Sequence, residues 1–202
     1  MGCEFMIYTK VNINNITKEE YEKWYSLMGD EKKLRIDKYR FTDDQKRSIA
    51  GEMLAKTTIG KYLDIPAEQI KLAQGKSGKP YAVNFNIEFN ISHCEEIVVC
   101  AINNTPVGID IERIRPISPE VAKKFFTIAE QKYILGKTPC AEDYDTEFND
   151  VQLKRFFECW TAKEAYLKYT GEGLTDNLSA LEIDNTHITK IIENDYIISI
   201  YC

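Results

Sequence analysis

The chain has 202 residues, 44% of them hydrophobic and 29% charged, and its formal net charge at pH 7 is −6. This composition is ordinary for a globular protein and fits one domain or two small ones. The negative balance argues against a general nucleic-acid binder, which gains affinity from a basic surface. The apolar runs are far shorter than the roughly 20 residues that a membrane span needs. Residues 1–10 lack the pattern of a secretory signal, so we expect a cytoplasmic protein without membrane contact.

The cysteines and histidines do not form a recognisable metal or disulfide pattern. The sequence contains no C-x-x-C pair, and its two histidines lie too far from the cysteines for a zinc site. A disulfide framework is not expected without a secretory signal. We therefore expect reduced thiols at all six cysteines, which are Cys3, Cys94, Cys100, Cys140, Cys159 and Cys202.

The first half of the chain, residues 1–104, is expected to be an α+β unit. Thr17 and Glu20 have the spacing of a capping box, and Asp43 and Asp44 are good N-cap residues for a long helix. The predicted elements are a strand at 5–11, helices at 17–28, 31–39 and 45–63, a loop around 75–80, and a strand at 97–102. The stretch from Lys32 to Arg47 is rich in basic residues, which allows a local anion pocket or a solvated helix face.

The second half, residues 105–202, is expected to be a second α+β unit without sequence repeat of the first. Residues 136–150 are polar and read as an exposed insertion. Gly171 is a plausible C-cap for the longest helix. The predicted elements are strands at 107–112, 181–183, 188–192 and 196–200, and helices at 118–125, 129–135 and 152–169.

Three carboxylates in this half are candidates for a metal site. Asp110 and Glu112 are two residues apart on a predicted strand, so their side chains point to the same side. Carboxylates placed together suit Mg²⁺, which binds oxygen ligands and substrate phosphates. The alternative is a solvated strand face. Glu164 lies four residues before Lys168 on a predicted helix, and that spacing is also typical of a surface ion pair.

Several motifs become specific when they are taken together and in order. They are Gly78-Lys79-Pro80, Phe89-Asn90-Ile91-Ser92-His93, Val107-Gly108-Ile109-Asp110-Ile111-Glu112, Phe125-Phe126 with Glu130, Trp160-Thr161-Ala162-Lys163-Glu164-Ala165 with Lys168, and Gly171-Glu172-Gly173-Leu174. This series resembles the 4′-phosphopantetheinyl transferases of the surfactin-synthetase-activating (Sfp) type. The resemblance covers at least residues 40–175. One departure is Cys94, which stands where family members often have a second serine after the histidine.

The resemblance implies two similar α+β halves that form a pseudo-dimer, with the active site in the cleft between them. It implies Mg²⁺, or Mn²⁺, as the cofactor and coenzyme A as the co-substrate. The residues that match the family's functional positions fall into three groups. The metal ligands match Asp110, Glu112 and Glu164; the coenzyme A contacts match Arg47, Lys79, Pro80, Ser92, His93, Lys163 and Lys168; and the catalytic groups match Glu164, Lys168 and Glu130.

The reaction implied is attack by a carrier-protein serine on the β-phosphorus of coenzyme A, which releases 3′,5′-ADP and leaves a holo carrier protein. The carrier would belong to fatty-acid, polyketide or nonribosomal-peptide synthesis. Glu164 or Glu130 would accept the serine proton, and Lys168 would stabilise or protonate the leaving phosphate. Two other functions fit the residues: a non-catalytic module that binds coenzyme A or a carrier protein, and a Mg²⁺-dependent phosphohydrolase. The two-half architecture leads us to expect a monomer.

Overall fold

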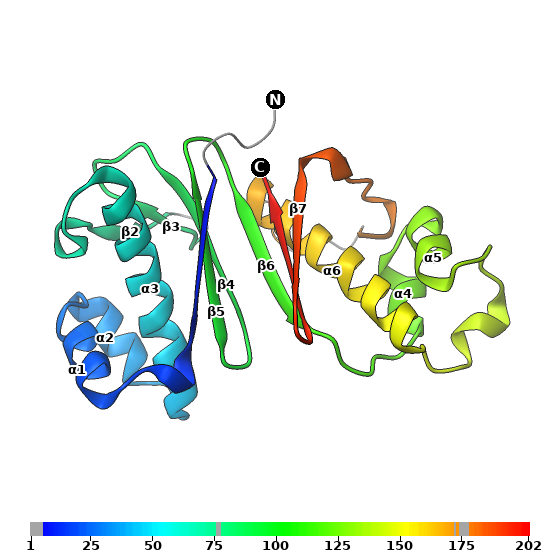
Figure 1. The fold of residues 1–202 in the computed structure, drawn as a ribbon, viewed down its shortest axis with the longest axis horizontal. Coiled ribbons are helices and arrows are strands. Elements are labelled where there is room, and N and C mark those ends of the chain that lie inside the picture. Colours follow the sequence, from blue (N-terminus) through cyan, green and yellow to red (C-terminus); the bar gives the residue numbers. More distant parts are fainter. Residues whose placement is uncertain (1–5, 76–77, 172, 174–177) are drawn as a thin grey trace. The chain divides into compact units, whose positions relative to one another are not determined.

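The computed structural model describes residues 6–75, 78–171, 173 and 178–202. Contacts along the chain divide it into two compact α+β units, one made of Met1–Val107 with Cys202 and the other of Gly108–Tyr201. Each unit has a three-stranded antiparallel sheet and one long helix packed against it (Figure 1). In the described part of the chain, no helix is both long and apolar enough to cross a membrane. The α+β class expected from the sequence is confirmed.

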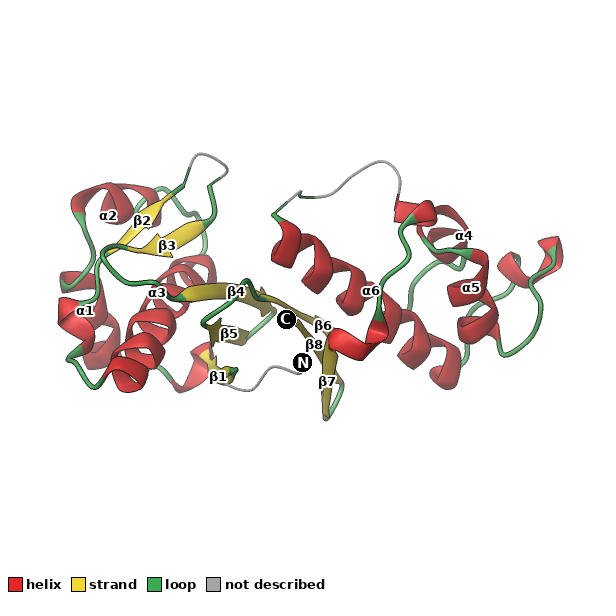
Figure 2. Cartoon of the chain, turned by 90° about the horizontal axis from the view of Figure 1, so that it is seen from above, coloured by secondary structure: helices red, strands yellow, loops and turns green. Residues whose placement is uncertain are grey.

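Unit 1 is built on a sheet with the strand order β1-β5-β4. The strands are β1 (Ile7–Asn12), β4 (Glu88–Cys94) and β5 (Ile97–Asn103). The helix α3 (Thr42–Leu63) lies along this sheet and contacts all three strands (Figures 1 and 2). Ile59 of the helix joins Phe89 and Ile102 of the strands in one buried cluster, which forms much of the core of the unit.

The remaining elements of unit 1 surround α3. They are α1 (Lys18–Ser26), α2 (Asp30–Ile36), and a hairpin of β2 (Leu72–Gln74) and β3 (Pro80–Ala82). The predicted capping box is present, because the Glu20 amide donates to Thr17 Oγ1 at 3.2 Å and the Thr17 amide donates to Glu20 Oε2 at 2.9 Å. The loop expected around 75–80 falls between the paired residues Gln74 and Pro80, and its residues 76–77 lie outside the described part of the chain.

The start of α3 differs from the prediction. The helix begins at Thr42, three residues earlier than expected, and Phe41 is its N-cap without a side-chain hydrogen bond. Asp43 and Asp44 therefore lie inside the first turn, where the positive end of the helix dipole stabilises their carboxylates. Both the N-cap and the first turn favour acidic residues, so composition alone does not separate the two placements.

Unit 2 repeats the plan with a sheet of order β6-β8-β7. Its elements are β6 (Gly108–Arg113), α4 (Glu120–Phe125), α5 (Ile128–Leu135), α6 (Asp150–Thr170), β7 (Ile188–Glu193) and β8 (Tyr196–Tyr201). The helix α6 packs on β6 and β8 and ends at Gly171, whose φ of 76° makes it the predicted C-cap (Figure 2). Phe126, Phe156 and Trp160 contribute to the aromatic core of unit 2.

A hydroxyl pair joins helix to sheet in both units. In unit 1, Thr58 of α3 shares a hydrogen bond of 2.7 Å with Thr9 of β1. In unit 2, Thr161 of α6 shares one of 2.7 Å with Ser199 of β8. Each threonine also donates to the carbonyl four residues before it in its own helix. The two long helices are thus fixed to their sheets by similar polar contacts inside apolar cores.

Three expectations for the polar and terminal segments are wrong. Residues 181–183 form no strand. The insertion 136–150 is not wholly exposed, because Tyr144 and Phe148 are each only 7% exposed and Phe148 belongs to the core of unit 2. Cys202 is disulfide-bonded, whereas the four cysteines at 94, 100, 140 and 159 are free. Residue spacing does not show which distant side chains the fold brings together, and that proximity decides burial and disulfide formation.

Candidate active site

An acidic residue and a lysine meet where β6 and α6 pack together. Asp110 is only 5% exposed, and its Oδ1 accepts a hydrogen bond from Lys168 Nζ at 2.6 Å. Its neighbours Ile109 and Ile111 are buried, as the alternation of a strand predicts. A buried carboxylate is tolerated because the paired ammonium compensates part of the lost hydration.

Gly108 explains how the strand and the helix come this close. A Cβ atom at this position would lie 1.9 Å from the backbone oxygen of Ala165 and 2.5 Å from the backbone nitrogen of Tyr169. A side chain of any size would therefore push β6 away from α6. Because Asp110 follows two residues later on the same side of the strand, the glycine fixes the distance between Asp110 and the helix.

Glu112 and Glu164 complete the acidic cluster. Glu112 lies two residues after Asp110, and its Oε2 accepts a hydrogen bond from Arg115 Nη1 at 3.0 Å. Glu164 lies on α6 one turn before Lys168. Burial raises the pKa of the Glu164 carboxyl, the nearby Asp110 carboxylate raises it further, and the Lys168 ammonium acts in the opposite direction. The environment of Glu164 therefore favours a positive charge beside it.

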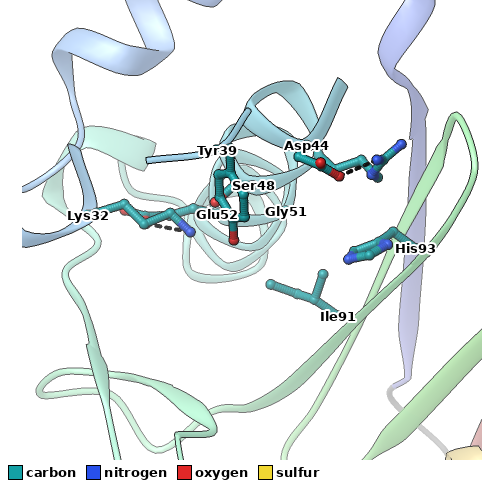
Figure 3. Close-up of a pocket in the computed structure, with 9 residues that line it drawn as sticks. Lys32, Tyr39, Asp44, Ser48, Gly51, Glu52, Ile91 and His93 are labelled. Carbon is teal, nitrogen blue, oxygen red and sulfur yellow. Dashed lines mark hydrogen bonds and ion pairs between the residues drawn. The ribbon is translucent and has the colours of Figure 1, made fainter. Parts of the chain in front are cut away.

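A pocket in unit 1 gathers several charged and polar side chains. It has a volume of about 380 Å³, within the usual range for small-molecule sites. Lys32 of α2 and His93 of β4 reach into it from different sides of α3 (Figure 3). The complete lining consists of Lys32, Tyr39, Asp44, Arg47, Ser48, Gly51, Glu52, Ile91 and His93.

Arg47 is held in place in this pocket by two contacts. Its Nη1 donates to the backbone oxygen of Glu95 at 2.8 Å, and its Nη2 pairs with the Asp44 carboxylate. A guanidinium has five N–H donors in a rigid fork, so donors remain for a ligand. The strand β4 places His93 on the same side as Ile91, since both line the pocket.

Comparison with known protein families gives a match for each half of the chain, and the two matches agree. Residues 106–199 match the family described as the 4′-phosphopantetheinyl transferase superfamily, and residues 15–105 match the one described as 4′-phosphopantetheinyl transferase, N-terminal. The 4′-phosphopantetheinyl transferase gsp of Aneurinibacillus migulanus is 36% identical over 187 residues, which span 93% of this chain and 74% of that protein. The chain belongs to the 4′-phosphopantetheinyl transferase family.

More distant relatives agree with this assignment. The 4′-phosphopantetheinyl transferase Sfp of Bacillus subtilis is 30% identical over 169 residues, which span 83% of this chain and 71% of that protein. The L-aminoadipate-semialdehyde dehydrogenase-phosphopantetheinyl transferase of Mus musculus is 31% identical over 175 residues, which span 82% of this chain and 55% of that protein. The predicted activity is confirmed: the protein is a transferase of phosphopantetheine to carrier proteins, with coenzyme A as co-substrate.

The transferase has the oxygen ligands for a divalent ion, but its side chains are not arranged as a closed site. Among the described residues, no group of three His, Cys, Asp or Glu side chains is placed to hold a metal ion. Lys168 pairs with Asp110, and Arg115 pairs with Glu112. The chemistry of the three carboxylates fits Mg²⁺. Each of these two ion pairs is made through one oxygen of the carboxylate, Oδ1 of Asp110 and Oε2 of Glu112.

Lys163 and Glu130 of the transferase form an ion pair between α6 and α5. Lys163 is 2% exposed and pairs with Glu130 Oε2 at 2.9 Å. Its Nζ also donates to three backbone oxygens, those of Phe125 at 3.2 Å, Leu178 at 2.5 Å and Leu181 at 3.2 Å. These acceptors engage all three ammonium protons. Glu130 Oε2 also caps α5 by accepting from the Thr127 amide at 2.8 Å. Both residues thus make structural contacts, and the roles that the resemblance implies for them at coenzyme A and in catalysis stay predictions.

The other predicted coenzyme A contacts lie outside the pocket lining. Ser92 is buried, and strand alternation directs it away from the side of β4 that carries His93. Pro80 begins β3, and Lys79 Nζ lies 3.9 Å from Glu88 Oε2. The unit 1 pocket therefore includes Arg47 and His93 of the predicted set, whereas Ser92, Lys79 and Pro80 do not line it.

Sequence reasoning missed part of the pocket although one signal was present. Asp44, Ser48, Gly51 and Glu52 recur at spacings of three and four, which places them on one face of α3. The helix was predicted correctly over most of its length, so this face could have been identified. Lys32 comes from a separate helix; the basic stretch from Lys32 to Arg47 allowed a local pocket, but it did not show that Lys32 meets this face of α3.

Proposed function

We propose that the transferase acts on the pyrophosphate of coenzyme A with the acidic cluster of unit 2. The observation that supports this most directly is the contact of 2.6 Å between Lys168 Nζ and Asp110 Oδ1, with Glu164 one helical turn away. Phosphoryl transfer depends on positioning and charge neutralisation more than on covalent help from the protein. A lysine beside carboxylates can offer a positive charge to a phosphate, while the acids orient it.

A divalent ion is part of the proposal. Asp110, Glu112 and Glu164 would hold Mg²⁺, with Mn²⁺ as a possible substitute, since all three offer carboxylate oxygens on the α6 side of β6. When bound, the ion would polarise the pyrophosphate and neutralise its charge. The raised pKa of Glu164, caused first by burial and then by Asp110, supports the presence of a cation at this position.

Two residues of α6 would move the protons of the reaction. The serine oxygen bonds to the β-phosphorus of coenzyme A, and the bond from that phosphorus to the oxygen of 3′,5′-ADP breaks. Glu164 would accept the serine proton; a bound cation would lower its basicity, and the raised pKa that burial and Asp110 give to this carboxyl would offset part of that loss. Lys168 would stabilise the departing phosphate or protonate it. Glu130 is less suited to the role of base because its Oε2 is occupied by Lys163 and by the Thr127 amide.

The pocket of unit 1 would bind the 3′-phosphoadenosine end of coenzyme A. Arg47 retains N–H donors for a phosphate, and His93 lies in the same lining. Arg47→Ala should raise the KM for coenzyme A with little change in kcat. The same substitution should not affect turnover of 3′-dephospho-coenzyme A. Equal effects on both substrates would remove Arg47 from phosphate recognition. The predicted contacts at Lys79, Pro80 and Ser92 remain predictions.

Intact-protein mass spectrometry tests the proposed chemistry. The transferase is mixed with coenzyme A, Mg²⁺ and an apo carrier protein, with a parallel sample in EDTA. We expect the carrier to gain the mass of one phosphopantetheine group, and we expect EDTA to prevent this gain. Release of 3′,5′-ADP in the absence of carrier would instead favour a phosphohydrolase, and binding of coenzyme A without turnover would favour a non-catalytic module.

Variants on α6 separate the catalytic residues from their surroundings. Lys168→Met and Asp110→Asn should each lower kcat by about a hundredfold or more, as for loss of a charged group at a phosphoryl-transfer centre. Lys154→Met is the matched control, because Lys154 lies on the same helix and is exposed. Wild-type turnover by Lys168→Met would exclude its role at the phosphate.

The proposal extends to the state of the protein. We propose that the transferase works as a monomer and does not bind nucleic acid, in line with its net charge of −6. Light scattering coupled to gel filtration measures the first point, and binding to a DNA fragment measures the second. The cytoplasmic location expected from the sequence stays a prediction.

A further inference from the structure

Three charged side chains form a chain of ion pairs beside the unit 1 pocket. Glu52 of α3 lies on the pocket wall, with its Oε2 3.9 Å from Lys32 Nζ and its Oε1 2.7 Å from Lys56 Nζ. Figure 3 shows Lys32 and Glu52 joined at one side of the pocket. The side chains are largely buried, with 18% of Lys32, 14% of Glu52 and 10% of Lys56 exposed.

The arrangement is asymmetric with respect to the pocket. Lys32 and Glu52 line it, whereas Lys56 lies one turn further along α3 and is not part of the lining. Both lysines pair with the same carboxylate, so the three groups together carry one positive charge when all are ionised. Lys32 can reach a ligand in the pocket, whereas Lys56 can act on that ligand only indirectly, through Glu52 or through its charge on Lys32.

The charged groups around Lys32 act on it in opposite directions. Burial lowers the pKa of Lys32 to about 8, and the charges of Arg35 and Lys56 lower it as well, while the Glu52 carboxylate raises it. Asp44, Arg47 and His93 complete the titratable lining from α3 and β4. Lys32 therefore carries its charge below about pH 8 and loses it above.

We propose that Glu52 is a positioning residue for phosphate recognition: through its shared ion pairs with Lys32 and Lys56, it sets how much positive charge Lys32 presents to a phosphate monoester in the unit 1 pocket. This inference rests on the proposed function of that pocket. A charged hydrogen bond to phosphate corresponds to roughly ten- to a hundredfold in affinity. Affinity for a phosphate monoester should therefore fall by roughly this factor as the pH rises through the range in which Lys32 is deprotonated.

Calorimetric titration with 3′,5′-ADP tests the inference on the full chain. The dissociation constant is measured between about pH 7 and pH 9, where the phosphates stay fully ionised because their second pKa lies near 6. In the wild-type protein, affinity should begin to fall near the Lys32 pKa of about 8 and continue to fall as the pH rises further. Lys32→Met should bind more weakly at pH 7 and should lose this dependence on pH.

Two further variants should shift this fall in affinity in opposite directions. Glu52→Gln removes the carboxylate that favours the charged ammonium of Lys32, so the fall in affinity should shift to lower pH. Lys56→Gln removes a like charge, so the fall should shift to higher pH. Lys61→Gln is the matched control, because Lys61 lies on the same helix, is exposed, and pairs with none of these groups in the described ion pairs. It should leave the profile unchanged.

The outcomes distinguish this inference from the proposed function of the pocket. Failure of 3′,5′-ADP to bind the wild-type protein at any pH would remove the pocket assignment itself. Binding with the same pH profile in wild-type, Glu52→Gln and Lys56→Gln would retain the pocket and overturn the role of Glu52. Thermal melts monitor folding, and if Glu52→Gln is unfolded, Glu52→Asp replaces it: the shorter side chain moves the carboxylate away from Lys32, so the fall should again shift to lower pH, and an unchanged profile would overturn the role of Glu52.

Discussion

Two lysines of α6, five residues apart, show how position on a helix decides what a charged side chain does. Lys168 is partly exposed and pairs with Asp110 of β6. Lys163 faces the interior, where it ties α6 to Glu130 and to three backbone oxygens. The resemblance implies a place near the phosphates for both, and in this structure the two side chains have different partners.

Replacement of Lys163 should reduce stability. Lys163→Met leaves the partly buried Glu130 carboxylate and three carbonyls without their shared donor, which should cost about 3 kcal/mol in the free energy of unfolding. Urea denaturation measures this change. Lys154→Met is the control and should cost less than about 1 kcal/mol, because Lys154 is exposed on the same helix. Equal losses for the two variants would contradict the distinction between them.

Gly108 allows β6 to lie close to the backbone of α6 because it has no side chain. Gly108→Ala should cost at least about 2 kcal/mol, because the new Cβ meets the backbone of α6 and the strand must move. Turnover should fall as well, since the strand carries Asp110. Denaturation and the carrier mass assay measure the two effects. Gly29→Ser, at a glycine with open space around it, should be tolerated, and a stable, active Gly108→Ala would show that β6 and α6 can separate without loss.

At the scale of elements, the helices follow signals that are local in sequence. Capping boxes begin α1, α5 and α6, and glycines in the left-handed conformation end α5 and α6. These signals depend on neighbouring residues only, so the predicted helices were close to the observed ones. The segment 181–183 shows the opposite case: its β-like composition forms no strand, because a strand also needs a partner to complete its hydrogen bonds.

The N-terminal cap of α6 should contribute measurably to the stability of the protein. The Gln152 amide donates to Asn149 Oδ1 at 3.1 Å, and Gln152 Oε1 accepts from the Asn149 amide at 3.0 Å. Asn149→Ala should destabilise the protein by about 1 kcal/mol, whereas Asn149→Asp should be nearly neutral because aspartate is an equally good cap. Thermal or urea unfolding compares the two. A loss as large for aspartate as for alanine would show that the cap is not the source of the effect.

At the scale of the whole molecule, each unit has its own core. Ile59 is buried in a cluster of unit 1 with Phe89 and Ile102, and Ile134 is buried in a cluster of unit 2 with Phe126 and Phe156. Each unit also has its own group of candidate functional residues, the charged pocket in unit 1 and the acidic cluster in unit 2. The assignment to one family rests on both units, since each matches its own family description.

Because the two cores are separate, we expect substitutions in them to have additive effects on the free energy of unfolding. Ile59→Val and Ile134→Val should each lower the free energy of unfolding by about 1 kcal/mol. The double variant should show the sum of the two within about 0.5 kcal/mol, because the residues share no cluster. Urea denaturation of the wild-type protein, the two single variants and the double variant measures this double-mutant cycle. A coupling energy well above this margin would mean that the two cores do not respond independently.

The sequence by itself determined the family, most helices and the residues of the acidic cluster. These features depend on local signals: capping pairs, the alternation of a strand, and motifs such as Gly108-Ile109-Asp110-Ile111-Glu112. The motifs follow one another along the chain in the order that the resemblance to the family requires. Asp110 and Glu112 were correctly placed on a strand, and Glu164 and Lys168 on a helix. Periodicity indicates which side chains share a face of one element, so this much could be predicted without coordinates.

Only the tertiary structure decided which faces meet. It paired Lys168 with Asp110, directed Lys163 to Glu130, buried Tyr144 and Phe148 of the insertion, and brought Lys32 to the same pocket as Glu52. Each of these contacts joins residues from different elements. Their proximity depends on how helices pack on sheets and on the one close approach that Gly108 permits, and no spacing within a single element encodes that distance.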